Sequence, residues 1–219
     1  MKDKIKNLKK IPSDITSTID RKLDRSLKYV HWNYVLEGVL IALGVIALII
    51  SLFYDSYVAD NITLYHTPAL DIFFKVISSF YFLAFVLFIL TTYLMYVQKK
   101  RDGILPLWVS YFAATLVVAI IKLLVARERP IGGEDLIWFD KFSFPSMHAA
   151  VCFAVLPILD IKFPKMKIFW ISLVFLVAIS RIYLQMHFLS DVIAGALIGY
   201  IVGITVIMIY QKQVYKVKW

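Results

Sequence analysis

The sequence predicts an all-α integral membrane protein, a bundle of six transmembrane helices. Hydrophobic residues make up 61% of the 219 residues, above the roughly 45–50% of soluble domains. They fall in long runs separated by short charged stretches. Because a helix needs roughly 20 apolar residues to cross a bilayer, these runs favour membrane spans over a large soluble helical bundle.

Six apolar segments are the expected spans. They cover residues 35–53, 72–97, 105–125, 149–161, 168–180 and 189–210. The fourth and fifth are short for a span, so their ends are expected to reach into the flanking residues. Pro157 lies inside the fourth segment and is expected to kink it.

The basic residues are unevenly distributed about these segments. Of the 24 lysines and arginines, 18 fall on the side that carries both termini. Since cytoplasmic loops are rich in lysine and arginine, both termini are expected in the cytoplasm of a multi-pass cell-membrane protein. Loops 54–71, 126–147 and 181–188 are then expected outside. The net charge of +9 is thus explained by topology and anionic inner-leaflet lipid rather than by nucleic acid.

The chain is expected to have three parts. Residues 1–34 form a basic cytoplasmic tail, either solvated or folded as an amphipathic helix on the membrane surface. Its basic stretch is too long for a secretory signal. Residues 35–210 form the membrane domain, and residues 211–219 form a cytoplasmic C-terminal tail. The single cysteine, Cys152, excludes a disulfide within the chain and lies in an apolar run as a small core residue.

Polar residues gather at the outward ends of the predicted spans. Ionisable groups at such positions are costly and usually functional. Because the third, fourth, fifth and sixth segments all present their polar residues on the same side, these residues are expected to converge on one pocket. They fall in three groups: Lys122 with Arg129-Pro130; Pro145-Ser146 with His148; and Ser180-Arg181 with His187 and Asp191.

This set of residues suits phosphate binding. Lys122, Arg129 and Arg181 supply three fixed positive charges. The planar fork of arginine matches two phosphate oxygens, and lysine adds a point charge. Ser146 precedes the fourth predicted helix, whose N-terminal N–H groups favour anions.

The two histidines suit phosphoryl transfer, which needs a nucleophile and a proton donor on opposite sides of phosphorus. His187 and Asp191 are four residues apart and are expected on one helix face, where the carboxylate can orient the imidazole. No Asp, Glu and His cluster has metal-ligand spacing, so neither a metal nor another cofactor is expected. The arginines are expected to stabilise the transferring phosphoryl group instead.

In order and spacing, the three groups resemble the signature motifs of the type 2 phosphatidic acid phosphatase superfamily, over roughly residues 105–200. The resemblance implies a six-helix membrane phosphatase that needs no metal and works through a phosphohistidine. By motif position, His187 would be the nucleophile, Asp191 would orient it, and His148 would protonate the leaving group. The residues that would hold the phosphate are Lys122, Arg129, Ser146 and Arg181.

One position departs from the family pattern. Met147 stands between Ser146 and His148, where these phosphatases usually have glycine. Glycine would allow the backbone to approach phosphate closely, and related lipid phosphotransferases often carry a large apolar residue there. The acceptor of the phosphoryl group is therefore open between water and another alcohol.

Three functions remain from the sequence. The first is a lipid phosphatase or pyrophosphatase acting on an isoprenoid diphosphate, a phosphatidylglycerol phosphate or a phosphatidate. The second is a lipid phosphotransferase, and the third is a non-enzymatic anion-binding membrane protein. Paired histidines argue against the third, because a passive anion site needs only positive charge. The expected partners are the lipid substrate and membrane lipids, not nucleic acid.

A few residues near the motifs match no motif position. Arg127 is interpreted as a snorkelling cation or a substrate-side charge, because the motif spacing selects Arg129. His66 is interpreted as an interfacial residue. Tyr183 and Gln185 lie inside the third motif and are expected either to line the pocket or to pack.

Overall fold

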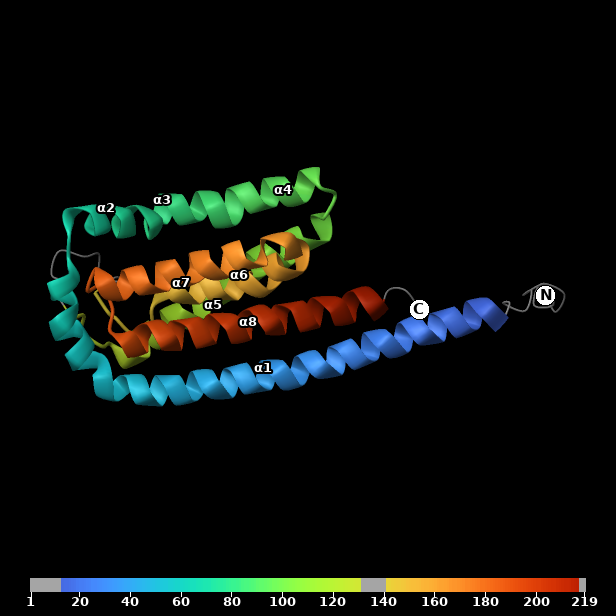
Figure 1. The fold of residues 1–219 in the computed structure, drawn as a ribbon, viewed down its shortest axis with the longest axis horizontal. Helices are drawn as coiled ribbons and strands as arrows, with labels where there is room; N and C mark the ends of the chain where they lie inside the picture. Colours follow the sequence, from blue (N-terminus) through green and yellow to red (C-terminus); the bar gives the residue numbers. More distant parts are fainter. Residues whose placement is uncertain (1–12, 131–140, 217–219) are drawn as a thin grey trace. The chain divides into compact units, whose positions relative to one another are not determined.

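The computed structural model describes residues 13–130 and 141–216, and side chains within 35–130 and 141–210. The predicted tail residues 1–12 and 217–219, and residues 131–140 of the predicted outer loop, lie outside it. The chain forms two compact units, Met1–Leu43 and Gly44–Trp219. What the structure describes of the first is a single stretch of helix, and the second holds every other element (Figure 1).

No strand occurs in the described ranges, so the all-α prediction is confirmed. The main helices are α1 (Ser13–Asn61), α2 (Pro68–Ile77), α3 (Phe80–Leu83), α4 (Thr91–Val97), α5 (Ile104–Val125), α6 (Met147–Lys162), α7 (Lys167–Tyr183) and α8 (Leu189–Lys216). Short 3₁₀ turns lie between them, η1 (Ile62–Tyr65), η3 (Arg101–Gly103) and η5 (Pro164–Met166), and the π-helical η2 (Ala84–Leu90) joins α3 to α4.

Five stretches among the described residues are long and apolar enough to cross a membrane. They are Val35–Tyr65, Phe80–Val97, Arg101–Val125, Pro164–Tyr183 and Leu189–Tyr210. The fourth predicted segment corresponds to α6, which has 16 residues and contains Pro157. The multi-pass membrane fold therefore holds, whereas five helices rather than six have the length of a span.

The predicted outer loop 54–71 is largely helical. Helix α1 continues to Asn61 and is followed by η1. Only then does the chain enter α2, where Thr67 caps the helix by accepting the N–H of Leu70 at 3.3 Å. The polar residues that indicated a loop instead make contacts from a helix: Asp55, for example, is buried against the start of α8.

The predicted segment 72–97 is interrupted rather than continuous. Helix α2 ends at Ile77, and a new helix begins at Phe80 and runs through α3, the π-helical η2 and α4. Two serines explain the break. Ser79 accepts the N–H of Phe82 at 3.2 Å as an N-cap, and the hydroxyl of Ser78 donates to the carbonyl of Phe74 at 2.7 Å.

Helix α6 lies at the centre of the second unit and packs against α5, α7 and α8 (Figure 1). Most of the side chains buried in these four helices are apolar, including Leu107, Val118, Cys152, Val155, Leu159, Val174 and Val177. This packing brings the C-terminal ends of α5 and α7 beside the N-terminal ends of α6 and α8.

Three glycines allow α8 to approach α6 closely. At each of them, a Cβ would come within 3.0 Å of a backbone carbonyl oxygen of α6 or of the residue before it. The pairs are Gly195 with Ser146, Gly199 with Ala150, and Gly203 with Ala154. Small residues at four-residue spacing are a common basis for helix contacts in membranes. Because the first pair includes Ser146, this contact also sets the position of one predicted phosphate ligand.

Candidate active site

All three motif groups lie at one end of the second unit. Lys122 lies in the last turn of α5, and Arg181 in the last turn of α7. Ser146 precedes α6, and His148 is its second residue. His187 lies in the turn between α7 and α8. The structure therefore brings the motif groups to the same end, as alternating spans require.

The imidazole of His187 is buried, with 3% of the residue exposed. Its Nδ1 atom lies 2.7 Å from the carbonyl oxygen of Ser143. A carbonyl oxygen only accepts hydrogen bonds, so Nδ1 carries the proton and Nε2 keeps its lone pair. Asp191 is farther away, with Oδ2 at 3.7 Å from Nδ1. The backbone of Ser143 thus supports the tautomer that was expected to depend on Asp191.

The carboxylate of Asp191 is fully buried and held from two sides. Oδ2 accepts the backbone N–H of Phe188 at 2.8 Å, and Oδ1 accepts Nη1 of Arg127 at 2.8 Å. Arg127 also donates through Nη2 to Oδ2 of Asp55 at 2.8 Å. The interpretation of Arg127 as a snorkelling cation is therefore wrong, since its guanidinium bridges two buried carboxylates.

The three predicted phosphate-binding cations are also buried. Lys122 donates to the carbonyl oxygen of Phe142 at 2.5 Å. Arg129 donates through Nη1 to the carbonyl oxygen of Met186 at 2.6 Å. Arg181 donates through Nη1 to the hydroxyl of Ser78 at 3.4 Å, across the break between α2 and α3. These contacts anchor the cations to different elements.

These cations act on both histidines. Burial lowers the pKa of His187 well below its usual 6.5, and the charges of Arg181, Arg129 and Lys122 lower this pKa further. The hydrogen bond to Ser143 opposes the shift. Burial and the charges of the same three cations and of His187 also lower the pKa of His148 well below 6.5, so His148 needs the negative charge of a bound phosphate to hold a proton near pH 7. The imidazole of His187 is therefore neutral near pH 7. The three cations that lower its pKa also act on His148.

Ser146 is buried at the start of α6. Its backbone N–H donates to the carbonyl oxygen of Asp191 at 2.9 Å, which ties α6 to the first turn of α8. Its Oγ does not cap α6 and has no hydrogen-bond partner among the described residues. A buried hydroxyl usually has a partner in a native structure, so this oxygen is available to a ligand.

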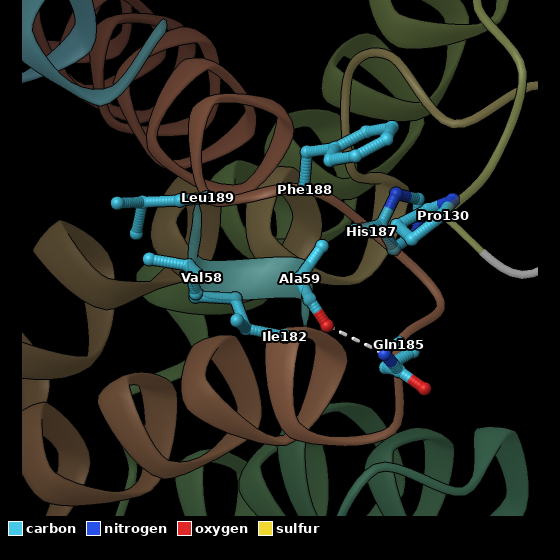
Figure 2. Close-up of a pocket in the computed structure, with 8 residues that line it drawn as sticks. All are labelled: Val58, Ala59, Pro130, Ile182, Gln185, His187, Phe188 and Leu189. Carbon is cyan, nitrogen blue, oxygen red and sulfur yellow. Dashed lines mark hydrogen bonds between the residues drawn. The ribbon is translucent and has the colours of Figure 1, made fainter. Parts of the chain in front are cut away.

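A small, partly open pocket borders His187 (Figure 2). Its lining comes from the ends of α1 and α7, from Pro130, and from the turn that leads into α8 together with the first residue of that helix: Val58, Ala59, Pro130, Ile182, Gln185, His187, Phe188 and Leu189. Gln185 donates to the carbonyl oxygen of Ala59 at 2.7 Å, so it both lines the pocket and joins the turn to α1. No group of three His, Cys, Asp or Glu side chains suited to a metal occurs in the described ranges.

Tyr183 has a packing role. Its ring stacks on His66 with centroids 4.3 Å apart, and its hydroxyl donates to Asp71 at 2.7 Å. The hydroxyl also accepts the N–H of Thr67 at 3.1 Å. His66 is thus part of a contact between the start of α2 and the end of α7.

Sequence reasoning missed Asp55, Ser143 and Ser190. Ser143 acts through its backbone, which a motif does not show. Ser190 donates its N–H to Asp55 and its hydroxyl accepts Arg127 at 2.7 Å. Asp55 had a usable signal, because an acidic residue at the end of an apolar segment implies a buried partner.

Known proteins resemble this chain in the part that contains the motif residues. A family model described as the PAP2 superfamily matches residues 103–215. A lipid A 4'-phosphatase of Bacteroides thetaiotaomicron is 34% identical over 100 residues, covering 40% of this chain and 44% of that protein. Phosphatidylglycerophosphatase B of Bacillus subtilis is 30% identical over 117 residues, covering 48% of this chain and 57% of that protein. The chain thus spans about half the length of these curated relatives.

Two solved structures share the fold. One is a crystal structure of a transmembrane PAP2 type phosphatidylglycerolphosphate phosphatase from Bacillus subtilis, with a TM-score of 0.62 and 23% identity, covering 80% of this chain and 96% of that one. The other is Aquifex aeolicus LpxE, with a TM-score of 0.58 and 29% identity, covering 70% and 94%. Because the family model matches more than half of the sequence, including every motif residue described above, the chain belongs to the PAP2 superfamily.

Proposed function

We propose that this protein is a membrane lipid phosphatase that hydrolyses a phosphomonoester or diphosphate of a lipid through a phosphohistidine on His187. One observation carries the proposal. His187 and His148 come from different elements, yet they lie within electrostatic reach of each other and of the same three cations. Such an arrangement supplies a nucleophile, a proton donor and charge stabilisation for one phosphoryl group.

In the first step, the Nε2 lone pair of His187 attacks phosphorus. The bond from phosphorus to the leaving oxygen breaks, and His148 gives that oxygen a proton. His187 keeps its proton on Nδ1 and becomes positively charged; the Ser143 carbonyl at 2.7 Å and the Asp191 carboxylate at 3.7 Å stabilise this charge. For a diphosphate, the leaving group is the lipid monophosphate.

The phosphoryl oxygens carry most of the charge during transfer, and catalysis depends on positioning and on positive charge around them. Lys122, Arg129 and Arg181 supply that charge. Ser146 adds a hydroxyl donor, because its Oγ makes no hydrogen bond to the described protein. The low pKa of His187 supports this role, since the ring must be neutral before it attacks.

In the second step, water attacks the phosphohistidine. The neutral His148 takes a proton from the water, the N–P bond breaks, and its electron pair returns to Nε2 of His187. Inorganic phosphate leaves, and both histidines return to their starting states. Neither step requires a metal ion or another cofactor.

The proposed substrates are isoprenoid diphosphates, phosphatidylglycerol phosphates and phosphatidates, taken from the outer leaflet of the cell membrane. The curated relatives are named as phosphatases acting on lipid A and phosphatidylglycerophosphate, which supports a lipid substrate and water as the acceptor. The excess of basic residues on the side opposite the motifs supports an outward-facing active site.

The test is phosphate release in detergent with EDTA, from a panel of lipid phosphates and diphosphates. Wild type is compared with His187→Ala and with the control His66→Phe, which changes a histidine packed on Tyr183. We expect release by wild type and His66→Phe and none by His187→Ala. Equal release by all three would overturn the mechanism. Phosphate transfer to an added alcohol without release to water would identify a phosphotransferase.

A further inference from the structure

Asp55 is a buried acid near the end of α1 with no counterpart in the three motifs. It lies in a stretch apolar enough to cross the membrane, and only 4% of the residue is exposed. A carboxylate in such a stretch is costly unless it has specific partners. Its partners are Ser190, in the first turn of α8, and Arg127, which follows α5.

Asp55 supplies a helix cap from another helix. The residue before α8 is Phe188, which has no side-chain acceptor for the free N–H groups of the first turn. Oδ1 of Asp55 accepts the N–H of Ser190 at 2.8 Å. The carboxylate also accepts the hydroxyl of Ser190 through Oδ2. The first turn of α8, which contains Asp191, is thus tied to α1.

Arg127 links Asp55 to Asp191 directly. Nη2 donates to Asp55 at 2.8 Å, and Nη1 donates to Oδ1 of Asp191 at 2.8 Å. Nη1 also donates to the hydroxyl of Ser190 at 2.7 Å, and the guanidinium lies over the ring of Phe188, 4.1 Å from its centroid. A planar guanidinium with a carboxylate on each terminal nitrogen has a fixed orientation.

The fixed guanidinium in turn orients Asp191. Arg127 holds Oδ1, so Oδ2 faces the N–H of Phe188 at 2.8 Å and Nδ1 of His187 at 3.7 Å. Without Asp55, Arg127 would lose one of its two carboxylates and the first turn of α8 would lose a cap. Asp191 would then be less well placed to stabilise positive charge on His187.

We infer that Asp55 is a positioning residue that acts through Arg127 and Ser190 to hold the Asp191 carboxylate beside His187 during phosphoryl transfer. The inference rests on the proposed function, because it assigns Asp55 a role in the step that His187 performs. The competing explanation is that Asp55 only fastens α1 to α8. That explanation predicts lost stability without a specific effect on catalysis.

The experiment uses the full chain in detergent with the lipid substrate found active in the panel. Asp55→Asn keeps the shape but removes the charge that Arg127 binds. Ser190→Ala removes only the hydroxyl shared by Asp55 and Arg127 and serves as a second variant if Asp55→Asn folds poorly. Asp71→Asn is the matched control: Asp71 also joins two helices at this end, through Tyr183 and His66, and neither of these contacts involves Asp191. The readouts are kcat, KM, thermal unfolding, and the rate of acid-labile phosphoenzyme formation from a ³²P-labelled lipid phosphate.

We expect Asp55→Asn to lower kcat and the rate of phosphoenzyme formation by about 10–100-fold, with KM little changed, because misplacing a catalytic group costs that much. Ser190→Ala should lower both quantities as well, but by less, and Asp71→Asn should leave both unchanged.

Unchanged kcat in Asp55→Asn and Ser190→Ala, with His187→Ala inactive, would overturn the positioning role and leave the proposed function standing. An equal loss in Asp71→Asn would show that helix anchoring is responsible, which also overturns it. Activity in His187→Ala, or none in wild type, would instead overturn the proposed function, and this inference with it.

Discussion

The Nδ1 atom of His187 lies 2.7 Å from the carbonyl oxygen of Ser143. Asp191, the residue expected to orient this ring, is farther from Nδ1, at 3.7 Å. Two acceptors therefore face the same proton, one neutral and one charged. The neutral acceptor is sufficient to fix the tautomer, and the charged one is better suited to stabilise the positive charge that follows attack on phosphorus.

This division of roles predicts the effect of Asp191→Asn. Changing the aspartate of a serine-protease triad costs about 10⁴-fold in kcat because the imidazole takes the wrong tautomer. Here Ser143 still requires the proton on Nδ1, so we expect a smaller loss, about 100-fold, from lost charge stabilisation. The measurement is kcat for Asp191→Asn beside His187→Ala. Equal losses in both would mean that Asp191 sets the tautomer after all.

The pH dependence of kcat/KM should follow the lowered pKa of His187. A lowered pKa keeps the ring neutral as the pH falls below 6.5, and the nucleophile is lost only when the pH falls through the lowered value. The acid limb should therefore lie well below pH 6.5. Arg181→Gln removes the largest charge acting on His187, so it should raise this pKa and move the limb to higher pH.

The control for this prediction is the substrate itself. Using one lipid phosphate for wild type and Arg181→Gln keeps the ionisation of the substrate the same in both profiles. Any difference between the acid limbs then belongs to the protein. An acid limb at or above pH 6.5 in wild type would contradict the assignment of a neutral, buried nucleophile, and so would a shift to lower pH in the variant.

Arg129→Lys should behave as a loss rather than a conservative change. Arg129 uses Nη1 to bind the carbonyl oxygen of Met186 at 2.6 Å, and its planar guanidinium carries further N–H donors in a fixed fork. An ammonium cannot present the same fork. We expect kcat/KM to fall by about 100-fold. Arg101→Lys is the control, because Arg101 lies over the ring of Tyr96, in η3 before the start of α5 and away from the motif residues. An equal loss of kcat/KM in Arg101→Lys would contradict the prediction.

The sequence predicted the convergence of the motif residues because alternating spans leave little freedom. Lys122 ends one span, Ser146 and His148 begin the next helix, and Arg181 ends the one after it. Consecutive antiparallel helices put these ends on the same side. Short-range patterns therefore sufficed for the part of the active site that the motifs cover.

The Asp55–Arg127 contact was not predicted because the sequence near Asp55 indicates a buried partner but does not identify which residue that partner is. The two residues are 72 positions apart, and the polar residues after the first apolar run indicated a loop. The break at Ser78 and Ser79 was missed for a different reason. Apolar residues continue on both sides of it, and the helix ends because two serine hydroxyls bond to nearby backbone groups.

The close contact between α6 and α8 predicts that Gly199→Ala destabilises the protein. A Cβ at this position would come within 3.0 Å of the backbone carbonyl oxygen of Ala150, so a helix must shift. Alanine favours a helix by about 1 kcal/mol over glycine, but overpacking costs about 1–3 kcal/mol, and we expect a net loss. Gly44→Ala is the control, because its Cβ would meet only the side chain of Leu197. Thermal unfolding in detergent measures both; a more stable Gly199→Ala would contradict the close approach.

The orientation of the active site can be tested with introduced cysteines in a Cys152→Ala background. Lys141 lies on the motif side and Lys165 in η5 at the other end, and both are exposed. A membrane-impermeant maleimide should label Lys141→Cys in intact cells and Lys165→Cys only after permeabilisation. The expectation follows from the 18 basic residues on the side of the termini. The reverse pattern would place the histidines at the cytoplasmic face, where the substrate would come from the inner leaflet and phosphate would be released into the cell.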